Sequence, residues 1–104
     1  MTSKQRAYLK SLAMTMDAVF QVGKGSVTPE MVSALDDVLE KRELIKVNVL
    51  PNCADDPNEL ARLIGERTRA EVVQVIGKKM VFYRPAKDPK KRHIELPPAG
   101  KKAQ

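Results

Sequence analysis

Two glycines, a lysine and a serine stand together at Gly23-Lys24-Gly25-Ser26, between a short apolar run and the signals for a helix start. The first backbone N–H groups of a helix are free, and the helix dipole favours a negative charge beside them. Glycine lets the backbone approach such an anion closely, and the lysine adds a positive charge. This segment therefore suits the binding of a phosphate group. An ordinary strand-to-helix turn is the alternative interpretation.

Neither of two well-known glycine-rich nucleotide motifs is present here. A Walker A loop needs serine or threonine directly after its lysine, whereas Gly25 follows Lys24, and the motif's first glycine is also missing. A dinucleotide fingerprint needs a third glycine at the position of Thr28. What remains is a short loop able to hold a phosphodiester backbone, as the GxxG loop of KH domains does.

The overall charge indicates a polyanionic partner. Nineteen Lys and Arg residues oppose 13 Asp and Glu residues in a chain of 104, which gives a net charge of +6 and a pI near 9.6. A basic domain is drawn to RNA, to DNA or to an anionic membrane surface. A soluble domain with a merely positive surface is the alternative.

No group of side chains predicts a catalytic or metal site. His93 is the only histidine and falls in a predicted tail, which is a poor place for a general base. Cys53 is the only cysteine, so neither an intrachain disulfide nor a multi-cysteine zinc site is possible. The aspartate pairs at 36–37 and 55–56 diverge on a helix or cap its start. We predict no enzymatic activity, no cofactor, no metal and no small-molecule substrate.

Helix signals occur at three places. Apolar residues recur at helical spacing over residues 3–16. A second helix is predicted from Pro29, behind the N-cap Thr28, to about Arg42. A third follows Asp56, which starts a capping-box pattern.

Runs rich in β-forming residues lie between and after these helices. They cover residues 18–22, 44–50, 72–76 and 80–84, and the last two flank a hairpin turn at Gly77-Lys78-Lys79. The order α-β-α-β-α-β-β predicts a single compact α/β domain with a four-stranded mixed sheet packed against three helices. Lys46 falls on the polar face of the second strand. Taken alone, Lys46 and the turn lysines are more often solvated than bound to a ligand.

The composition changes from Pro85 onward. Six basic residues there oppose only two acidic ones: Lys87, Lys90, Lys91, Arg92, Lys101 and Lys102 against Asp88 and Glu95. We predict a domain over residues 1–86 and a basic, flexible tail over 87–104, whose removal should weaken RNA binding but leave the fold intact. No secretory signal or membrane-length apolar run is present, so the expected location is the cytoplasm, with no membrane partner.

Three separated motifs resemble the CRM domain, and in particular its stand-alone bacterial YhbY-like members. They are Gln21-Val22-Gly23-Lys24-Gly25-Ser26-Val27, Arg42-Glu43-Leu44-Ile45-Lys46-Val47, and Val73-Gln74-Val75-Ile76-Gly77-Lys78 followed by Tyr83-Arg84. The resemblance runs from about residue 3 to residue 96. It implies a fold like the C-terminal domain of translation initiation factor three.

The same resemblance implies RNA binding through the glycine loop and the adjoining basic surface. The site residues that we predict on this basis are Gly23, Lys24, Gly25, Ser26, Lys46, Lys78, Lys79 and Arg84. It also implies ribosomal RNA and precursors of the large ribosomal subunit as partners, and a role in ribosome assembly. A module that docks on ribosomal proteins without touching RNA is the alternative.

One position departs from the family pattern. The family's loop has glycine at both ends of GxxG, and the second of these positions is Ser26. Either Gly25 supplies the conformational freedom instead, or the Ser26 hydroxyl donates to a phosphate.

Overall fold

A computed structural model describes residues 1–97 of the chain. Its elements are α1 (Ser3–Ala13), β1 (Phe20–Val22), α2 (Pro29–Arg42), β2 (Leu44–Val49), α3 (Pro57–Thr68), β3 (Glu71–Ile76), β4 (Lys79–Tyr83) and a short 3-10 helix, η1 (Pro89–Lys91). This order confirms the predicted α/β fold class. Helix α1 ends at Ala13, three residues before the predicted end at 16, and β1 begins two residues after the predicted start.

Side-chain caps fix the start of each α-helix. The cap oxygens of Thr2, Thr28 and Asp56 accept hydrogen bonds from the backbone N–H three residues on, at 3.1, 3.1 and 3.2 Å. Each such bond satisfies an N–H that the helix itself leaves free and contributes about 1 kcal/mol. The complete capping box lies at Thr2, where the Gln5 side chain returns the bond. At Asp56, where the sequence predicts such a box, the bond from the Glu59 N–H is the half that is present.

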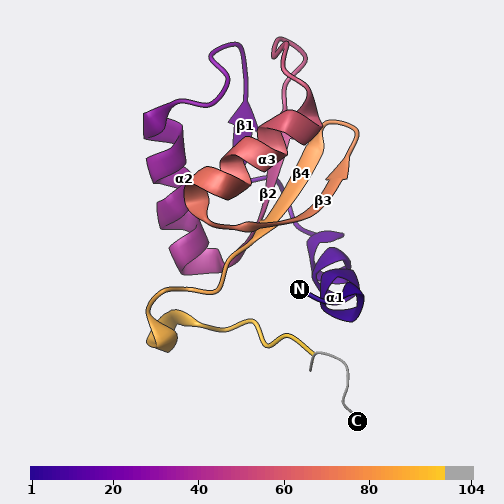
Figure 1. The fold of residues 1–104 in the computed structure, drawn as a ribbon, viewed down its shortest axis with the longest axis vertical. Coiled ribbons are helices and arrows are strands. Elements are labelled where there is room, and N and C mark those ends of the chain that lie inside the picture. The colour runs from indigo at the N-terminus through magenta and orange to yellow at the C-terminus, as the bar shows by residue number, and fades with distance from the viewer. Residues whose placement is uncertain (98–104) are drawn as a thin grey trace.

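The four strands form one mixed sheet in the order β1-β2-β4-β3. Strand β1 runs parallel to β2, and the pairs β2–β4 and β3–β4 are antiparallel. Because β1 and β2 are parallel, both end at the same end of the sheet, where the β3–β4 hairpin also turns. Figure 1 shows the connections that leave this end, above the strands.

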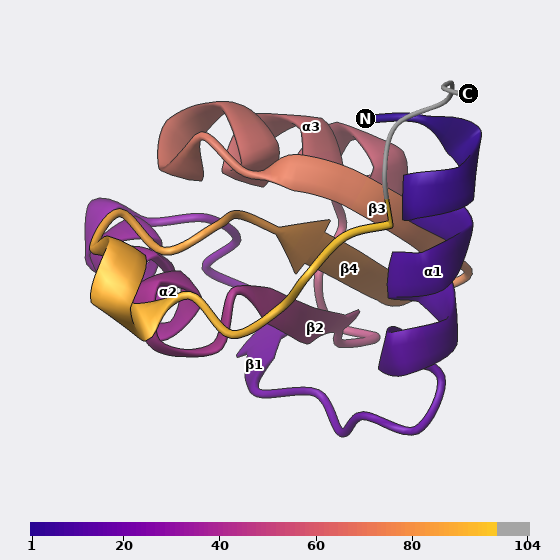
Figure 2. The same cartoon turned by 90° about the horizontal axis from the view of Figure 1, so that it is seen from below.

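Each face of the sheet carries its own apolar core. Helices α2 and α3 cover one face, and the side chains at its centre include Leu35, Ile45, Ile64 and Phe82. On the other face α1 packs Leu9 and Ala13 against strand residues that include Val73 and Val81. Figure 2 shows α1 beside β3 and β4, away from β1 and α2. Helix α1 therefore leaves part of this second face open.

A β-bulge interrupts the pairing of β3 with β4 between Val72 and Gln74. The extra residue places Val73 and Gln74 on the same face, because Val73 packs with the α1 core and Gln74 pairs with Val81. The guanidinium of Arg6 on α1 donates to the carbonyls of Val72 and Val73. Helix α1 is thus fixed to the bulge itself.

Residues 87–97, which the sequence analysis assigned to the tail, lie against the domain. Ile94 and Leu96 are partly buried against the α1 core, and the Gln5 side chain donates to the Pro97 carbonyl at 3.0 Å. Residues 98–104 lie outside the described part, so flexibility there stays a prediction. Within residues 1–97, no helix combines the length and the apolar content that crossing a bilayer requires.

Candidate nucleic-acid interface

The loop at residues 23–26 joins β1 to the N-terminus of α2, as predicted. The Ser26 N–H donates to the Gly23 carbonyl at 2.9 Å, which closes a four-residue turn with Lys24 and Gly25 at its tip. Both tip residues are exposed, and a Cβ added at Gly25 would meet no atom within 4 Å. The turn therefore presents Lys24 and open backbone beside the positive end of the helix dipole.

Ser26 supplies the unusual backbone conformation of this loop. Its φ is +54°, in the left-handed region, whereas Gly25 keeps a negative or extended φ. The Ser26 hydroxyl donates to the carboxylate of Asp55, which joins the loop to the segment before α3. The first alternative, that Gly25 takes over the glycine's role, therefore does not describe this loop. The hydroxyl already has a partner, which disfavours the second alternative.

Ser26→Gly should preserve RNA binding to within about twofold and leave the protein as stable or slightly more stable. Glycine removes about 1 kcal/mol or more of left-handed strain, while the lost exposed hydrogen bond costs about 0.5 kcal/mol. Urea melts and RNA titrations of the two proteins measure both quantities. A loss of affinity above about fivefold, 1 kcal/mol, with an intact fold would show that the hydroxyl contacts the RNA.

The structure brings the loop and the hairpin turn to one end of the sheet. The Leu50 N–H donates to the Val22 carbonyl at 2.8 Å, and the Val49 N–H donates to the Lys78 carbonyl at 2.7 Å. The turn begins at Gly77, whose φ is +57°. Loop 23–26 and Lys78 thus flank the end of β2, and we call them together the strand-end surface. Its two lysines, Lys24 and Lys78, are exposed.

Lys46 and Lys79 lie elsewhere, on the sheet face that carries α1. They line a groove beside that helix, together with Lys10, which the sequence analysis did not single out. Lys79 directly follows Lys78, so this groove adjoins the strand-end surface.

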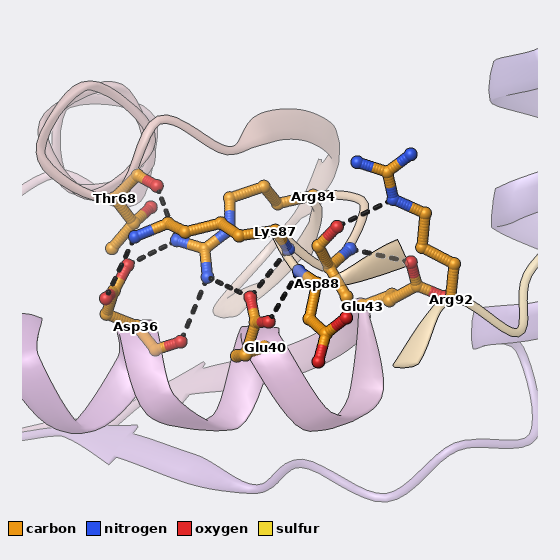
Figure 3. Close-up of polar contacts among 9 residues, drawn as sticks. Asp36, Glu40, Glu43, Thr68, Arg84, Lys87, Asp88 and Arg92 are labelled. Carbon is orange, nitrogen blue, oxygen red and sulfur yellow. Dashed lines mark hydrogen bonds and ion pairs between the residues drawn. The ribbon is translucent and has the colours of Figure 1, made fainter. Parts of the chain in front are cut away.

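Arg84 is buried, contrary to its predicted role as an RNA contact. Its guanidinium forms an ion pair with Asp36, lies 3.7 Å from Glu40 and donates to the Thr68 carbonyl at 2.9 Å (Figure 3). The hydrogen bond from Arg84 holds the pKa of Asp36 below its ordinary value, although burial opposes the shift. Because its donors face these acceptors inside the protein, we leave Arg84 out of the candidate RNA surface.

Two glutamates at the C-terminal end of α2, Glu40 and Glu43, bind backbone N–H groups of the segment 86–94, which follows Arg84. Glu43 is fully buried, and its carboxylate accepts the N–H groups of Ala86, His93 and Ile94 at 2.7, 2.8 and 3.0 Å. Burial alone would raise the pKa of Glu43, but these donors outweigh it and lower the pKa. Glu40 accepts the N–H groups of Lys87 and Asp88, at 2.7 and 3.0 Å, and these bonds lower its pKa. No local pattern in the sequence indicates that Glu43 is buried.

Within residues 1–97, no cluster of three or more His, Cys, Asp or Glu side chains could hold a metal ion. Two of the polar features that this part of the chain offers to a ligand are the strand-end surface and the basic groove beside α1.

The protein is a small α/β domain in which a glycine-containing turn, residues 23–26, precedes helix α2. The chain belongs to the CRS1 / YhbY (CRM) domain family, since the family's sequence profile matches residues 1–84. The family resemblance stated from the motifs is thereby confirmed.

Relatives match over nearly the whole chain. The Bacillus subtilis protein named "Probable RNA-binding protein YqeI" is 43% identical over 97 residues, which cover 93% of this chain and 99% of that protein. A Haemophilus influenzae protein named "RNA-binding protein" is 32% identical, with 93% and 95% covered. The solution structure of the hypothetical protein SAV1595 from Staphylococcus aureus is 52% identical, with a TM-score of 0.75 over 93% of this chain and 99% of that one.

Proposed function

We propose that this protein binds RNA through the strand-end surface, with loop 23–26 holding a phosphate of the RNA backbone. The observation that carries the proposal is the exposed Lys24-Gly25 tip at the amino end of α2. The helix dipole, the charge of Lys24 and the open backbone at Gly25 all favour an anion there. The names of the curated relatives, which refer to RNA binding and to no catalytic activity, support the proposal.

We further propose that the RNA is ribosomal, and that the protein acts in the cytoplasm on precursors of the large ribosomal subunit. This finer statement depends on the family resemblance. Crosslinking in cells followed by sequencing of the bound RNA tests it. Reads concentrated in large-subunit ribosomal RNA would support it, and reads spread evenly over messenger RNA would contradict it.

Lys24→Glu should weaken RNA binding by about tenfold, 1.4 kcal/mol, because it turns a local attraction into a repulsion. Lys4→Glu is the matched control: Lys4 is exposed on α1, away from the loop, and the change in net charge is the same. The logarithm of the binding constant should also fall less steeply with the logarithm of salt concentration in Lys24→Glu, by about one unit of slope. Fluorescence anisotropy at several salt concentrations measures both effects.

Equal weakening by Lys24→Glu and Lys4→Glu would mean that only the net charge counts and that the loop holds no phosphate. A wild-type protein that binds no RNA at any salt concentration would overturn the proposal. That second result would favour a module that docks on proteins.

A further inference from the structure

A groove of about 490 Å³ lies between α1 and the part of the sheet that α1 leaves open. The side chains that matter for its chemistry are Lys10 and Met14 from α1, Lys46 from β2, Gln74 and Ile76 from β3, and Lys79 from β4. Its size falls within the range of clefts that bind small organic groups. None of these side chains belongs to the strand-end surface, which consists of loop 23–26 and Lys78.

Two exposed apolar side chains line this groove. Met14 is 80% exposed and Ile76 is 61% exposed, the highest values among the large apolar residues of the described chain. They come from different elements, yet both line the one groove. Exposed apolar groups that gather at one site indicate binding. A methionine also contacts aromatic rings favourably through its polarisable sulfur.

The charged residues of the groove are all positive. Lys10, Lys46 and Lys79 line it, and no carboxylate does so. Such a groove complements a ligand that combines an aromatic or apolar part with negative charge. A nucleotide has this combination, because its flat base is joined through the sugar to phosphate.

A polar side chain is also directed to the groove by a specific feature of the fold. The bulge in β3 puts Gln74 on the α1 face, and Arg6 holds the carbonyls of the bulge in place. A glutamine amide can both donate to and accept from the edge of a base. Bulges commonly re-aim a side chain in this way.

We propose that the groove binds an unpaired base of the RNA, with the neighbouring phosphates on its three lysines. The base lies between Met14 and Ile76, and Gln74 bonds to its edge. Lys79 follows Lys78, so one RNA strand can pass from the strand-end surface into the groove. This inference rests on the proposed RNA binding and gives it a substrate class: RNA with an unpaired nucleotide, in preference to a continuous duplex.

Two RNA hairpins of equal length test the proposal, one fully paired and one with a single bulged adenosine in its stem. We expect the wild-type protein to bind the bulged hairpin about tenfold more tightly, since burial of one base between Met14 and Ile76, with its favourable contact to the methionine sulfur, supplies an effect of this size. Ile76→Ala and Gln74→Ala should each remove most of this preference. Neither substitution alters Val75 or Val81, the neighbouring strand residues that pack in the two cores, so the sheet should remain folded. Methyl signals of Met14 and Ile76, followed by NMR, should shift with the bulged hairpin and not with the paired one.

Two controls separate this proposal from the proposed function. Lys10→Glu should lower the affinity for the bulged hairpin more than Lys4→Glu, which changes the same charge on the same helix outside the groove. If the wild type binds both hairpins equally, Lys24→Glu weakens both, and the methyl signals do not move, RNA binding stands and the groove proposal is overturned. If neither hairpin binds, the proposed function itself fails. NMR shifts confined to loop 23–26, with none at Met14 or Ile76, would also overturn the groove proposal.

Discussion

Arg84→Ala should lower the free energy of unfolding by about 3 kcal/mol, because the guanidinium is the shared partner of groups on α2 and α3. Removing one member of a buried ion pair costs roughly 3–5 kcal/mol, and the low end applies here since Asp36 and Glu40 are partly exposed. The Thr68 carbonyl also loses a donor. Urea denaturation at neutral pH measures the difference.

Arg62→Ala provides a matched control within the same protein. Arg62 also pairs with two carboxylates, Glu59 and Glu66, but its side chain is 58% exposed. Its loss should cost no more than about 0.5 kcal/mol. If Arg84→Ala instead leaves stability unchanged and lowers RNA affinity tenfold, the residue contacts RNA as the sequence analysis predicted, and the buried ion pairs do not describe the protein in solution.

The elements could be predicted because their signals are local. Proline in the first turn and a capping side chain before it mark the starts of α2 and α3, and both begin at the predicted residue. The glycine turn and the hairpin turn were found for the same reason. The parallel pairing of β1 with β2 follows from the element order, so the position of loop 23–26 beside the end of β2 could also be predicted. The position of Lys78 beside the same strand end depends on the antiparallel pairing of β4 with β2.

The burial and pairing of the charged side chains could not be predicted, because they depend on partners far away in the sequence. Arg84 and Asp36 are 48 residues apart, and Glu43 receives donors from residues 43 to 51 positions later. Neither pairing leaves a local pattern. The bulge that directs Gln74 to the groove and the left-handed backbone of Ser26 are likewise set by packing and by contacts between separate segments.

Removing residues 87–104 should destabilise the domain by about 3–5 kcal/mol, contrary to the expectation from the sequence that truncation would leave the fold intact. The cut takes away two partly buried apolar side chains, Ile94 and Leu96, and two of the three N–H donors of buried Glu43. Ending the chain after Pro97 keeps all of these contacts and should change stability by less than about 0.5 kcal/mol. Thermal and urea melts of the two truncated proteins test the difference.

Glu43→Met distinguishes the lost carboxylate bonds from a general loss of packing. In the full chain this change removes the acceptor of three backbone donors and should cost about 2 kcal/mol or more. In the chain truncated after Ala86, Glu43 keeps only the Ala86 donor, so a buried, poorly paired carboxylate is replaced by an apolar group of similar length. The same substitution should then be neutral or stabilising. A change of sign between the two backgrounds, measured as a double-mutant cycle, is expected only if Glu43 anchors residues 87–97. Equal costs in both backgrounds would show that the segment is held by Ile94 and Leu96 alone.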